Sequence, residues 1–223
     1  MLHIFDVDNT VIKKTSAWHF LRQALSGGVV KLSQLRGLPR ELIRYKLGFP
    51  NMDFIEEAVK RFAGIEKDVL EKTAQACFER LIKPKIYTGA ERLIREALAR
   101  GERVIFATSS LSVIIKPLER YFGIEDSIAS ALELRENKTT GRLMGNSLFG
   151  IKKKEAAVSW LEKNSIEPQS VCFYSDSYTD LPLLELCGKP AAVNPDRFLA
   201  KTAKQRGWEI LRFGKTVGKN ISQ

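Results

Sequence analysis

Residues 2–10 read LHIFDVDNT, a short apolar run that gives way to two acids and a turn former. This pattern predicts a buried strand that ends in a loop. In a parallel α/β sheet, ligands bind beyond the carboxyl ends of the strands, so Asp6 and Asp8 stand where chemistry is expected. Two acids on one loop are common, however, and alone they identify no enzyme.

The rest of the chain shows two patterns. From about residue 16 to residue 85, apolar residues recur at helical spacing between glycine and proline breaks, which predicts several helices and no strand. Beyond residue 85, helical and extended patterns alternate, which predicts a mainly parallel sheet covered on both faces. We therefore expect a three-layer, Rossmann-like α/β core, residues 1–14 and 86–223, with an all-helical cap, residues 15–85, inserted after the first strand.

The core pattern also predicts individual elements. The predicted helices span 90–100, 111–121, 152–163 and 181–186, and the predicted strands span 103–108, 127–134, 140–144, 171–175, a short stretch near 191, and 209–213. The polar, basic tail after Gly214 is expected to fray. Trp18, Phe20 and Tyr45 are interpreted as the interior of the cap, and His3 and His19 as structural.

Composition narrows the class of protein. A chain of 223 residues with 44% hydrophobic residues can fold without cross-links, and its three cysteines predict buried thiols rather than a disulfide framework. With no signal-peptide pattern and no apolar run long enough to span a membrane, we expect a cytoplasmic protein.

The formal net charge of +10 favours anionic partners. Part of this excess lies between residues 29 and 49, which we interpret as a solvated face in preference to an anion site. The charged residues of this basic stretch are Lys31, Arg36, Arg40, Arg44 and Lys46, with the single acid Glu41.

Groups suited to phosphate chemistry recur at the ends of predicted strands. They are the acids Asp6 and Asp8, the hydroxyl run Thr108-Ser109-Ser110, the lysines Lys152, Lys153 and Lys154, and the acids Asp176 and Asp180. The hydroxyl run is predicted at a helix start, where it would cap the helix, bind a phosphate, or do both. Carboxylates brought together repel one another unless a cation is present. Mg²⁺ meets this need, because a few carboxylate oxygens, water and substrate phosphate complete its shell.

The order and wording of these segments resemble the haloacid dehalogenase superfamily, subfamily IB, the group similar to phosphoserine phosphatases. FDVDNT resembles its first motif, FATSS its second, the lysine after FG its third and YSDSYTDLPLLE its fourth. The resemblance implies a Mg²⁺-dependent phosphatase in which Asp6 attacks phosphorus and forms an aspartyl phosphate. Asp8 would protonate the leaving alcohol and then take a proton from water.

The resemblance also implies the remaining roles. These are phosphoryl binding by Thr108, Ser109 and Lys153, metal binding by Asp6, Asp176 and the carbonyl of Asp8, and support by Thr10 and Asp180. Lys153 is chosen because it lies three residues after Gly150, as the matching lysine does in similar sequences, with Lys154 as the second choice. Asp180 is also expected to serve as a helix N-cap before Pro182.

Two departures count against phosphoserine as the substrate. Thr15 stands where those phosphatases usually carry a glutamate for the substrate ammonium, and Thr108-Ser109-Ser110 replaces their Ser-Gly-Gly. We expect a small phosphorylated metabolite or a phospholipid head group, with peripheral contact to an acidic membrane and no stable nucleic-acid complex. Phosphoryl transfer to another acceptor and non-catalytic binding of lipid or nucleic acid remain alternative functions, and the sequence leaves the oligomeric state open.

Overall fold

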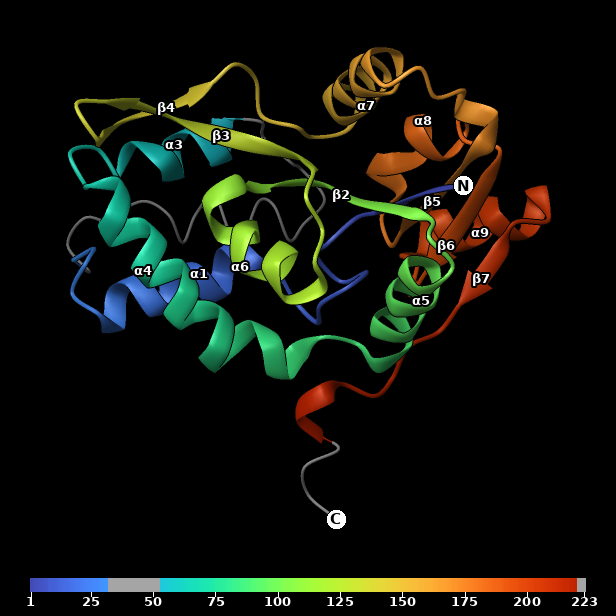
Figure 1. The fold of residues 1–223 in the computed structure, drawn as a ribbon, viewed down its shortest axis with the longest axis horizontal. Helices are drawn as coiled ribbons and strands as arrows, with labels where there is room; N and C mark the ends of the chain where they lie inside the picture. The colour runs from blue at the N-terminus through green and yellow to red at the C-terminus, as the bar shows by residue number, and fades with distance from the viewer. Residues whose placement is uncertain (32–52, 220–223) are drawn as a thin grey trace.

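The computed structural model describes residues 1–31 and 53–219, which are built around one sheet (Figure 1). In these residues the sheet has seven strands in the order β4-β3-β2-β1-β5-β6-β7. The strands are β1 Leu2–Phe5, β2 Arg103–Leu111, β3 Ser127–Arg135, β4 Lys138–Met144, β5 Val171–Ser175, β6 Lys189–Val193 and β7 Glu209–Leu211. Neighbouring strands are parallel except β3 and β4, which form an antiparallel hairpin.

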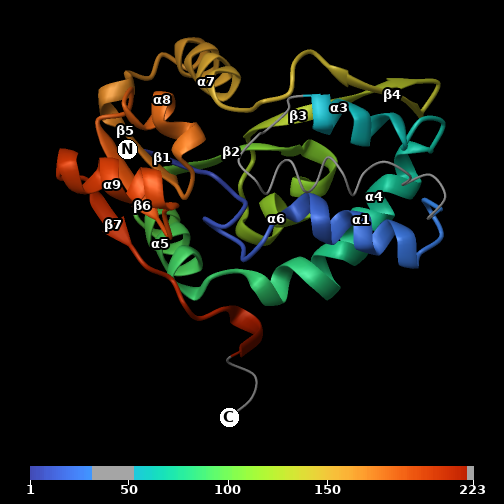
Figure 2. The ribbon, with the colours of Figure 1, turned by 180° about the vertical axis from the view of Figure 1, so that it is seen from behind.

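Alternate strand residues face two hydrophobic cores, because successive side chains of a strand point to opposite faces. In β1, Phe5 faces the core with helices α5 and α6, whereas Ile4 faces the core with α7, α8 and α9. These helices are α5 Thr88–Ala99, α6 Ser112–Phe122, α7 Ile151–Lys163, α8 Leu181–Leu184 and α9 Arg197–Arg206. Figure 2 shows α7 and α8 above the strands and α5 below them, so the sheet is the middle of three layers.

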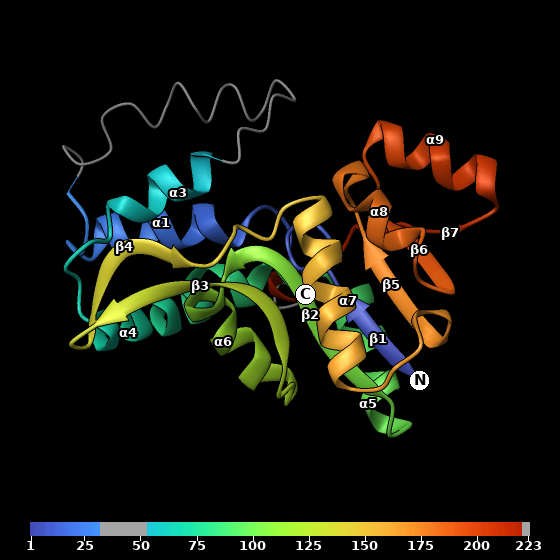
Figure 3. The same cartoon turned by 90° about the horizontal axis from the view of Figure 1, so that it is seen from above.

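A helical region lies between β1 and β2 in the sequence. Its described elements are α1 Ser16–Ser26, α3 Asp53–Lys60, α4 Lys67–Cys77, a π-helical turn Phe78–Ile82 and a 3₁₀ turn Lys83–Lys85. Helix α4 packs on α6, and α3 packs beside β4. Figure 3 shows α1 and α3 beside the β3–β4 hairpin, at the end of the molecule away from β5 and α9.

The two connections between this helical region and the sheet run side by side. Lys13 donates its backbone N–H to the Lys85 carbonyl, and Tyr87 donates to the Val11 carbonyl, both at 2.9 Å. Ile12 and Ile86 form an antiparallel bridge between them. The chain therefore leaves the sheet and returns to it at one place.

The predicted fold class is confirmed, since the sheet is mainly parallel and covered on both faces. The predicted end of the second strand is wrong. β2 continues through Thr108, Ser109 and Ser110, and α6 begins only at Ser112, so these hydroxyls do not cap a helix. The pairing of β2 with β3 is irregular between Ala107 and Leu111, as at the β-bulges that often adjoin active sites.

Helix α9 lies where no element was predicted. Its N-cap Asp196 accepts hydrogen bonds from the backbone N–H groups of Phe198 and Leu199, and Gly207 ends it in the left-handed region. Helix α8 ends at Leu184 and is therefore two residues shorter than the helix predicted over 181–186.

The tail after Gly214 does not fray over its described part. Thr88 donates to the Lys215 carbonyl, and Val217 donates to the Ile86 carbonyl. Thr216 between them is buried. The basic composition of the tail concealed this strand-like pairing with residues 86–88.

Three further observations bear on the sequence predictions. Cys77, Cys172 and Cys187 are free and buried, as predicted. Phe20 is buried, but Trp18 is 48% exposed and does not belong to the interior, while Tyr45 and the basic stretch beyond Lys31 lie outside the described residues. In the described ranges, none of the helices is both long and apolar enough to span a bilayer.

Candidate active site

The site lies beyond the carboxyl ends of the three central strands. Phe5 of β1 is in register with Phe106 of β2 and Tyr174 of β5. Asp6 follows Phe5 directly and donates its backbone N–H to the Tyr174 carbonyl at 2.9 Å, which fixes it at the sheet edge. Thr108 and Asp176 each lie two residues beyond their paired positions, so parallel register alone brings three separate segments together.

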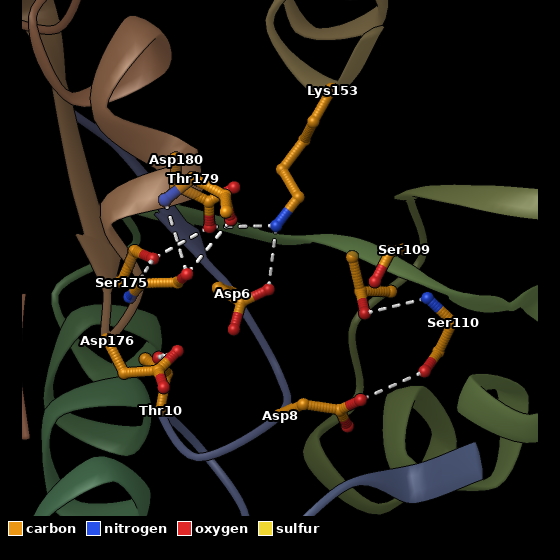
Figure 4. A network of polar contacts seen from close by, with 12 residues as sticks. Asp6, Asp8, Thr10, Ser109, Ser110, Lys153, Ser175, Asp176, Thr179 and Asp180 are labelled. Atoms are coloured by element: carbon orange, nitrogen blue, oxygen red, sulfur yellow. Dashed lines mark hydrogen bonds and ion pairs between the residues drawn. The ribbon is translucent and has the colours of Figure 1, made fainter. Parts of the chain in front are cut away.

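A buried ion-pair cluster forms the centre of the site (Figure 4). The ammonium of Lys153, which α7 delivers from above, lies 2.9 Å from Asp6 Oδ1 and 2.8 Å from Asp180 Oδ2. Lys153, Asp6 and Asp180 are only 3%, 6% and 2% exposed. Burial would lower the pKa of Lys153, but Asp180 and Asp6 together raise it, so the ammonium stays charged.

Asp8 has a different environment, to the other side of Asp6. Its Oδ1 accepts the backbone N–H of Ser16 at 2.8 Å, and its Oδ2 accepts the hydroxyl of Ser110 at 3.3 Å. Burial raises the pKa of Asp8, and these hydrogen bonds oppose the rise. Asn9, at φ +59°, turns the chain after Asp8, a conformation that asparagine tolerates better than most residues. A protonated Asp8 is therefore favoured more than in water, as a general acid requires.

Asp176, at the end of β5, lies apart from the lysine. Its Oδ1 accepts the hydroxyl of Thr10 at 3.4 Å. Burial, with the nearby charges of Asp6 and Asp180, raises its pKa to about 8. Burial likewise raises the pKa of Asp6 to about 7, although Lys153 opposes the rise. One lysine is thus not enough to hold the pKa values of the buried carboxyl groups of Asp6 and Asp176 in their ordinary range.

A divalent cation fits this set of groups. The raised pKa values of Asp6 and Asp176 show that their negative charges are under-compensated. Asp180 Oδ1 is buried and has no hydrogen-bond partner in the described part of the chain, so it would be available to accept a hydrogen bond from a water molecule that such a cation carries. Among the described residues no three acidic, imidazole or thiol side chains form a ready-made metal site. Mg²⁺ needs fewer, because it keeps several waters and uses one or two carboxylates.

The hydroxyl run near the end of β2 reaches the site through Ser110, which contacts Asp8. Thr108 is buried, and its Oγ1 accepts the Ser110 backbone N–H at 3.1 Å, which leaves the hydroxyl hydrogen available for a ligand. Ser109 lies beside Ser110, and its carbonyl accepts the hydroxyl of Ser130 at 3.4 Å. Lys152, next to the buried Lys153, pairs instead with Glu155 near the surface.

The structure therefore brings together Asp6, Asp8, Thr108, Lys153, Asp176 and Asp180, whereas Lys152 lies outside the cluster. Asp180 stands at the N-cap position of α8, but its side chain makes no capping hydrogen bond and binds Lys153 and Ser175 instead. His3 contacts Glu102 and His19 contacts the Lys13 carbonyl, so neither histidine belongs to the buried ion-pair cluster.

Sequence reasoning assigned no positioning role to Ser16, Ser110 or Ser175. The hydroxyls of Ser16 and Ser110 lie 2.5 Å apart although the two residues are 94 positions apart in the chain. Ser175 donates to Asp180 Oδ2 at 2.7 Å. Ser110 and Ser175 stood inside recognised segments, whereas Ser16 gave no local signal beyond its place at a predicted helix start.

Comparisons with known proteins show what the whole chain is similar to. A family model described as haloacid dehalogenase-like hydrolase matches residues 4–185. A protein named phosphoserine phosphatase from Mycobacterium tuberculosis is 31% identical over 214 residues, 94% of this chain and 70% of that protein. A protein named histidinol-phosphatase from Neisseria meningitidis is 31% identical over 221 residues, 95% of this chain and 98% of that protein. A crystal structure of a protein of unknown function from Bordetella pertussis superposes with a TM-score of 0.86 at 27% identity, covering 94% of this chain and 97% of that one.

Proposed function

The chain belongs to the haloacid dehalogenase-like hydrolase family, and from this premise we propose that it hydrolyses a phosphomonoester through an aspartyl phosphate formed on Asp6. The prediction of a hydrolase is confirmed by the family match, and the phosphatase names of the relatives support the phosphatase type. The observation that carries the proposal is the buried lysine held between Asp6 and Asp180.

Asp6 is suited to act as the nucleophile. Lys153 binds its Oδ1, and in the described residues no donor contacts Oδ2, which is left to attack phosphorus. As the bond from Oδ2 to phosphorus forms, the ester bond breaks and negative charge spreads over the phosphoryl oxygens. A fixed ammonium stabilises that charge without reorganising. The hydroxyl of Thr108 would donate to the same oxygens.

Asp8 is suited to move the protons. In the first step it gives its proton to the leaving alcohol oxygen. A water molecule then attacks phosphorus, Asp8 takes a proton from this water, and the bond to Asp6 breaks with release of inorganic phosphate. The backbone N–H of Ser16 and the hydroxyl of Ser110 orient the Asp8 carboxyl group, while Lys153 pairs with Asp6 and Asp180 instead.

We propose Mg²⁺ as the cofactor, held by Asp6, Asp176 and the backbone carbonyl of Asp8, with Asp180 accepting from a metal-bound water. The metal would neutralise charge on the phosphoryl group. Thr10 supports Asp176 through its hydroxyl.

We also propose that residues 15–85 form a cap that closes the site. The paired connections at Lys13 to Lys85 and Val11 to Tyr87 support this division. The substrates that we propose are small phosphorylated metabolites or phospholipid head groups. Cytoplasmic location, membrane contact and the absence of a nucleic-acid complex stay predictions.

The test is phosphate release from a panel of phosphomonoesters, with Mg²⁺ or EDTA, by the wild type and Asp6→Asn. This substitution removes the charge of the nucleophile and keeps its shape. We expect Mg²⁺-dependent release that the variant loses. Release that occurs only after an alcohol acceptor is added would indicate phosphoryl transfer, and salt-dependent binding of lipid or RNA without turnover would indicate a binding module.

A further inference from the structure

A cavity of about 180 Å³ opens beside Asp8, on the side away from Lys153. It lies between helices α1 and α3 and the junction of β2 with α6. Its apolar lining consists of Ala17, Trp18, Phe20, Leu21, Ile55, Ala58, Val59, Phe62, Leu111, Ile114 and Phe149. Asp8, Ser109 and Ser110 also line it, so an alcohol that leaves phosphorus and takes the proton of Asp8 would lie next to this cavity.

The charges of the residues that line the cavity disfavour ligands with an ammonium group. Apart from Asp8, no carboxylate lines the cavity in the described part of the chain, and the other charged lining residue is the cation Arg61. Both oxygens of Asp8 already accept hydrogen bonds, from Ser16 and Ser110. When Asp8 carries the proton that it gives to the leaving group, it is uncharged, so an ammonium that entered the cavity would lose its hydration and gain no counterion from the described lining, which is costly. The cavity is therefore suited to uncharged, apolar groups.

The size of the cavity sets the scale of that group. A dry cavity of roughly 150 Å³ lined by aliphatic and aromatic side chains accommodates benzene. The cavity beside Asp8 is slightly larger, and Trp18, 48% exposed, stands at its rim. It has room for one aromatic ring or a branched alkyl chain of similar volume.

We propose that this cavity holds the leaving group, and that the substrates are phosphomonoesters of apolar alcohols of about one aromatic ring in size that carry no ammonium. The proposal rests on the proposed function, because Asp8 must act on the ester oxygen for the leaving group to lie here. It separates this chain from its relatives named phosphoserine phosphatase and histidinol-phosphatase, whose names denote ammonium-bearing esters.

The first test compares two esters that differ only in the ammonium group, 3-phenylpropyl phosphate and phenylalaninol phosphate, with p-nitrophenyl phosphate as the reference. The ammonium makes its alcohol the better leaving group, so a preference for the apolar ester would come from binding. We expect kcat/KM to be at least ~10-fold higher for 3-phenylpropyl phosphate, within the range that pocket contacts supply. Histidinol phosphate and phosphoserine should be poorer still.

The second test adds the missing counterion. Thr15 lines the cavity and stands at the N-cap position of α1 without a side-chain capping hydrogen bond, so its replacement breaks no such bond. Thr15→Glu should lower the ratio of kcat/KM for 3-phenylpropyl phosphate to that for phenylalaninol phosphate by ~10-fold or more. Thr15→Gln, which is matched in size but uncharged, should leave this ratio within about twofold.

A third variant keeps the proposal testable if Thr15→Glu does not fold. Ala58→Leu narrows the cavity from α3 and should lower the ratio of kcat/KM for 3-phenylpropyl phosphate to that for propyl phosphate. An unchanged ratio would place the leaving group elsewhere and overturn the proposal.

The outcomes separate the two proposals. A wild type that hydrolyses p-nitrophenyl phosphate but prefers phenylalaninol, histidinol or serine phosphate would overturn the substrate class and leave the phosphatase proposal standing. A wild type that releases phosphate from no ester would overturn both.

Discussion

Replacement of Lys153 by methionine tests the buried cluster most sharply. Methionine keeps the length and much of the volume of the side chain but removes the ammonium that binds Asp6 and Asp180. Removing one partner of a buried ion pair costs about 3–5 kcal/mol of unfolding free energy, because the remaining charges lose their compensation. The two charge-assisted hydrogen bonds of Lys153, at about 1.5–3 kcal/mol each, give a similar figure for the same loss.

The same cluster predicts how this loss depends on pH. Asp6 has a pKa raised to about 7, so it takes up a proton below that pH and no longer needs the ammonium. The difference in stability between the wild type and Lys153→Met should thus be largest above pH 7 and should narrow below it. Urea denaturation in EDTA, followed by tryptophan fluorescence at pH 8 and pH 6, measures both values.

Lys152→Met is the matched control, since Lys152 is the preceding residue on the same helix but pairs with Glu155 near the surface. Exposed pairs of this kind contribute about 0–1 kcal/mol. A loss for Lys153→Met no larger than that of Lys152→Met at pH 8 would refute the buried cluster. Equal losses at the two pH values would refute the role of Asp6 in it.

Three further results are expected. The pKa values of Asp6 and Asp176 are raised above their values in the unfolded chain, so metal-free protein should lose stability as the pH rises through about 7 to 8. Because Mg²⁺ competes with protons for these carboxyl groups, it should raise Tm more at pH 8 than at pH 6. An equal rise in Tm at both pH values would contradict this. Ser110→Ala removes a hydrogen bond that lowers the pKa of Asp8. The acidic limb of the pH profile of kcat for p-nitrophenyl phosphate should therefore move to higher pH, and kcat at pH 6 should fall by about 3- to 10-fold. An unmoved limb would show that Ser110 does not affect the pKa of Asp8. Leu161→Ala opens a cavity under α7, the helix that carries the buried lysine, and should cost about 2–5 kcal/mol in urea denaturation; a cost below about 1 kcal/mol would mean that this helix is not anchored as described.

The sequence predicted the parts of the fold that rest on local periodicity. The buried strand before Asp6 and the strand before Asp176 are continuous apolar runs, and parallel register then places their following acids together. Lys153 was chosen from three consecutive lysines by the resemblance to similar sequences, in which the lysine lies three residues after the glycine, and the structure places it, rather than Lys152, in the buried cluster.

Other features depend on contacts that local patterns do not encode. Thr108-Ser109-Ser110 suits a helix start by propensity, but pairing of the flanking residues Ala107 and Leu111 with β3 keeps the run in a strand. Helix α9 carries an Asp196 N-cap and a terminal Gly207, yet a polar sequence concealed its period. The contact between Ser16 and Ser110 spans 94 residues and gave no signal in either segment.

The covalent step on Asp6 is the central claim, and a trapped intermediate tests it most directly. Asp8→Asn should still react with p-nitrophenyl phosphate, because this leaving group departs without an acid, but asparagine takes no proton from the water of the second step. Acid-quenched Asp8→Asn should therefore gain the mass of one phosphoryl group, located on the peptide that contains Asp6, and the double variant with Asp6→Asn should gain none. Phosphate release by the wild type with no such adduct in Asp8→Asn, or an adduct on another residue, would contradict the account.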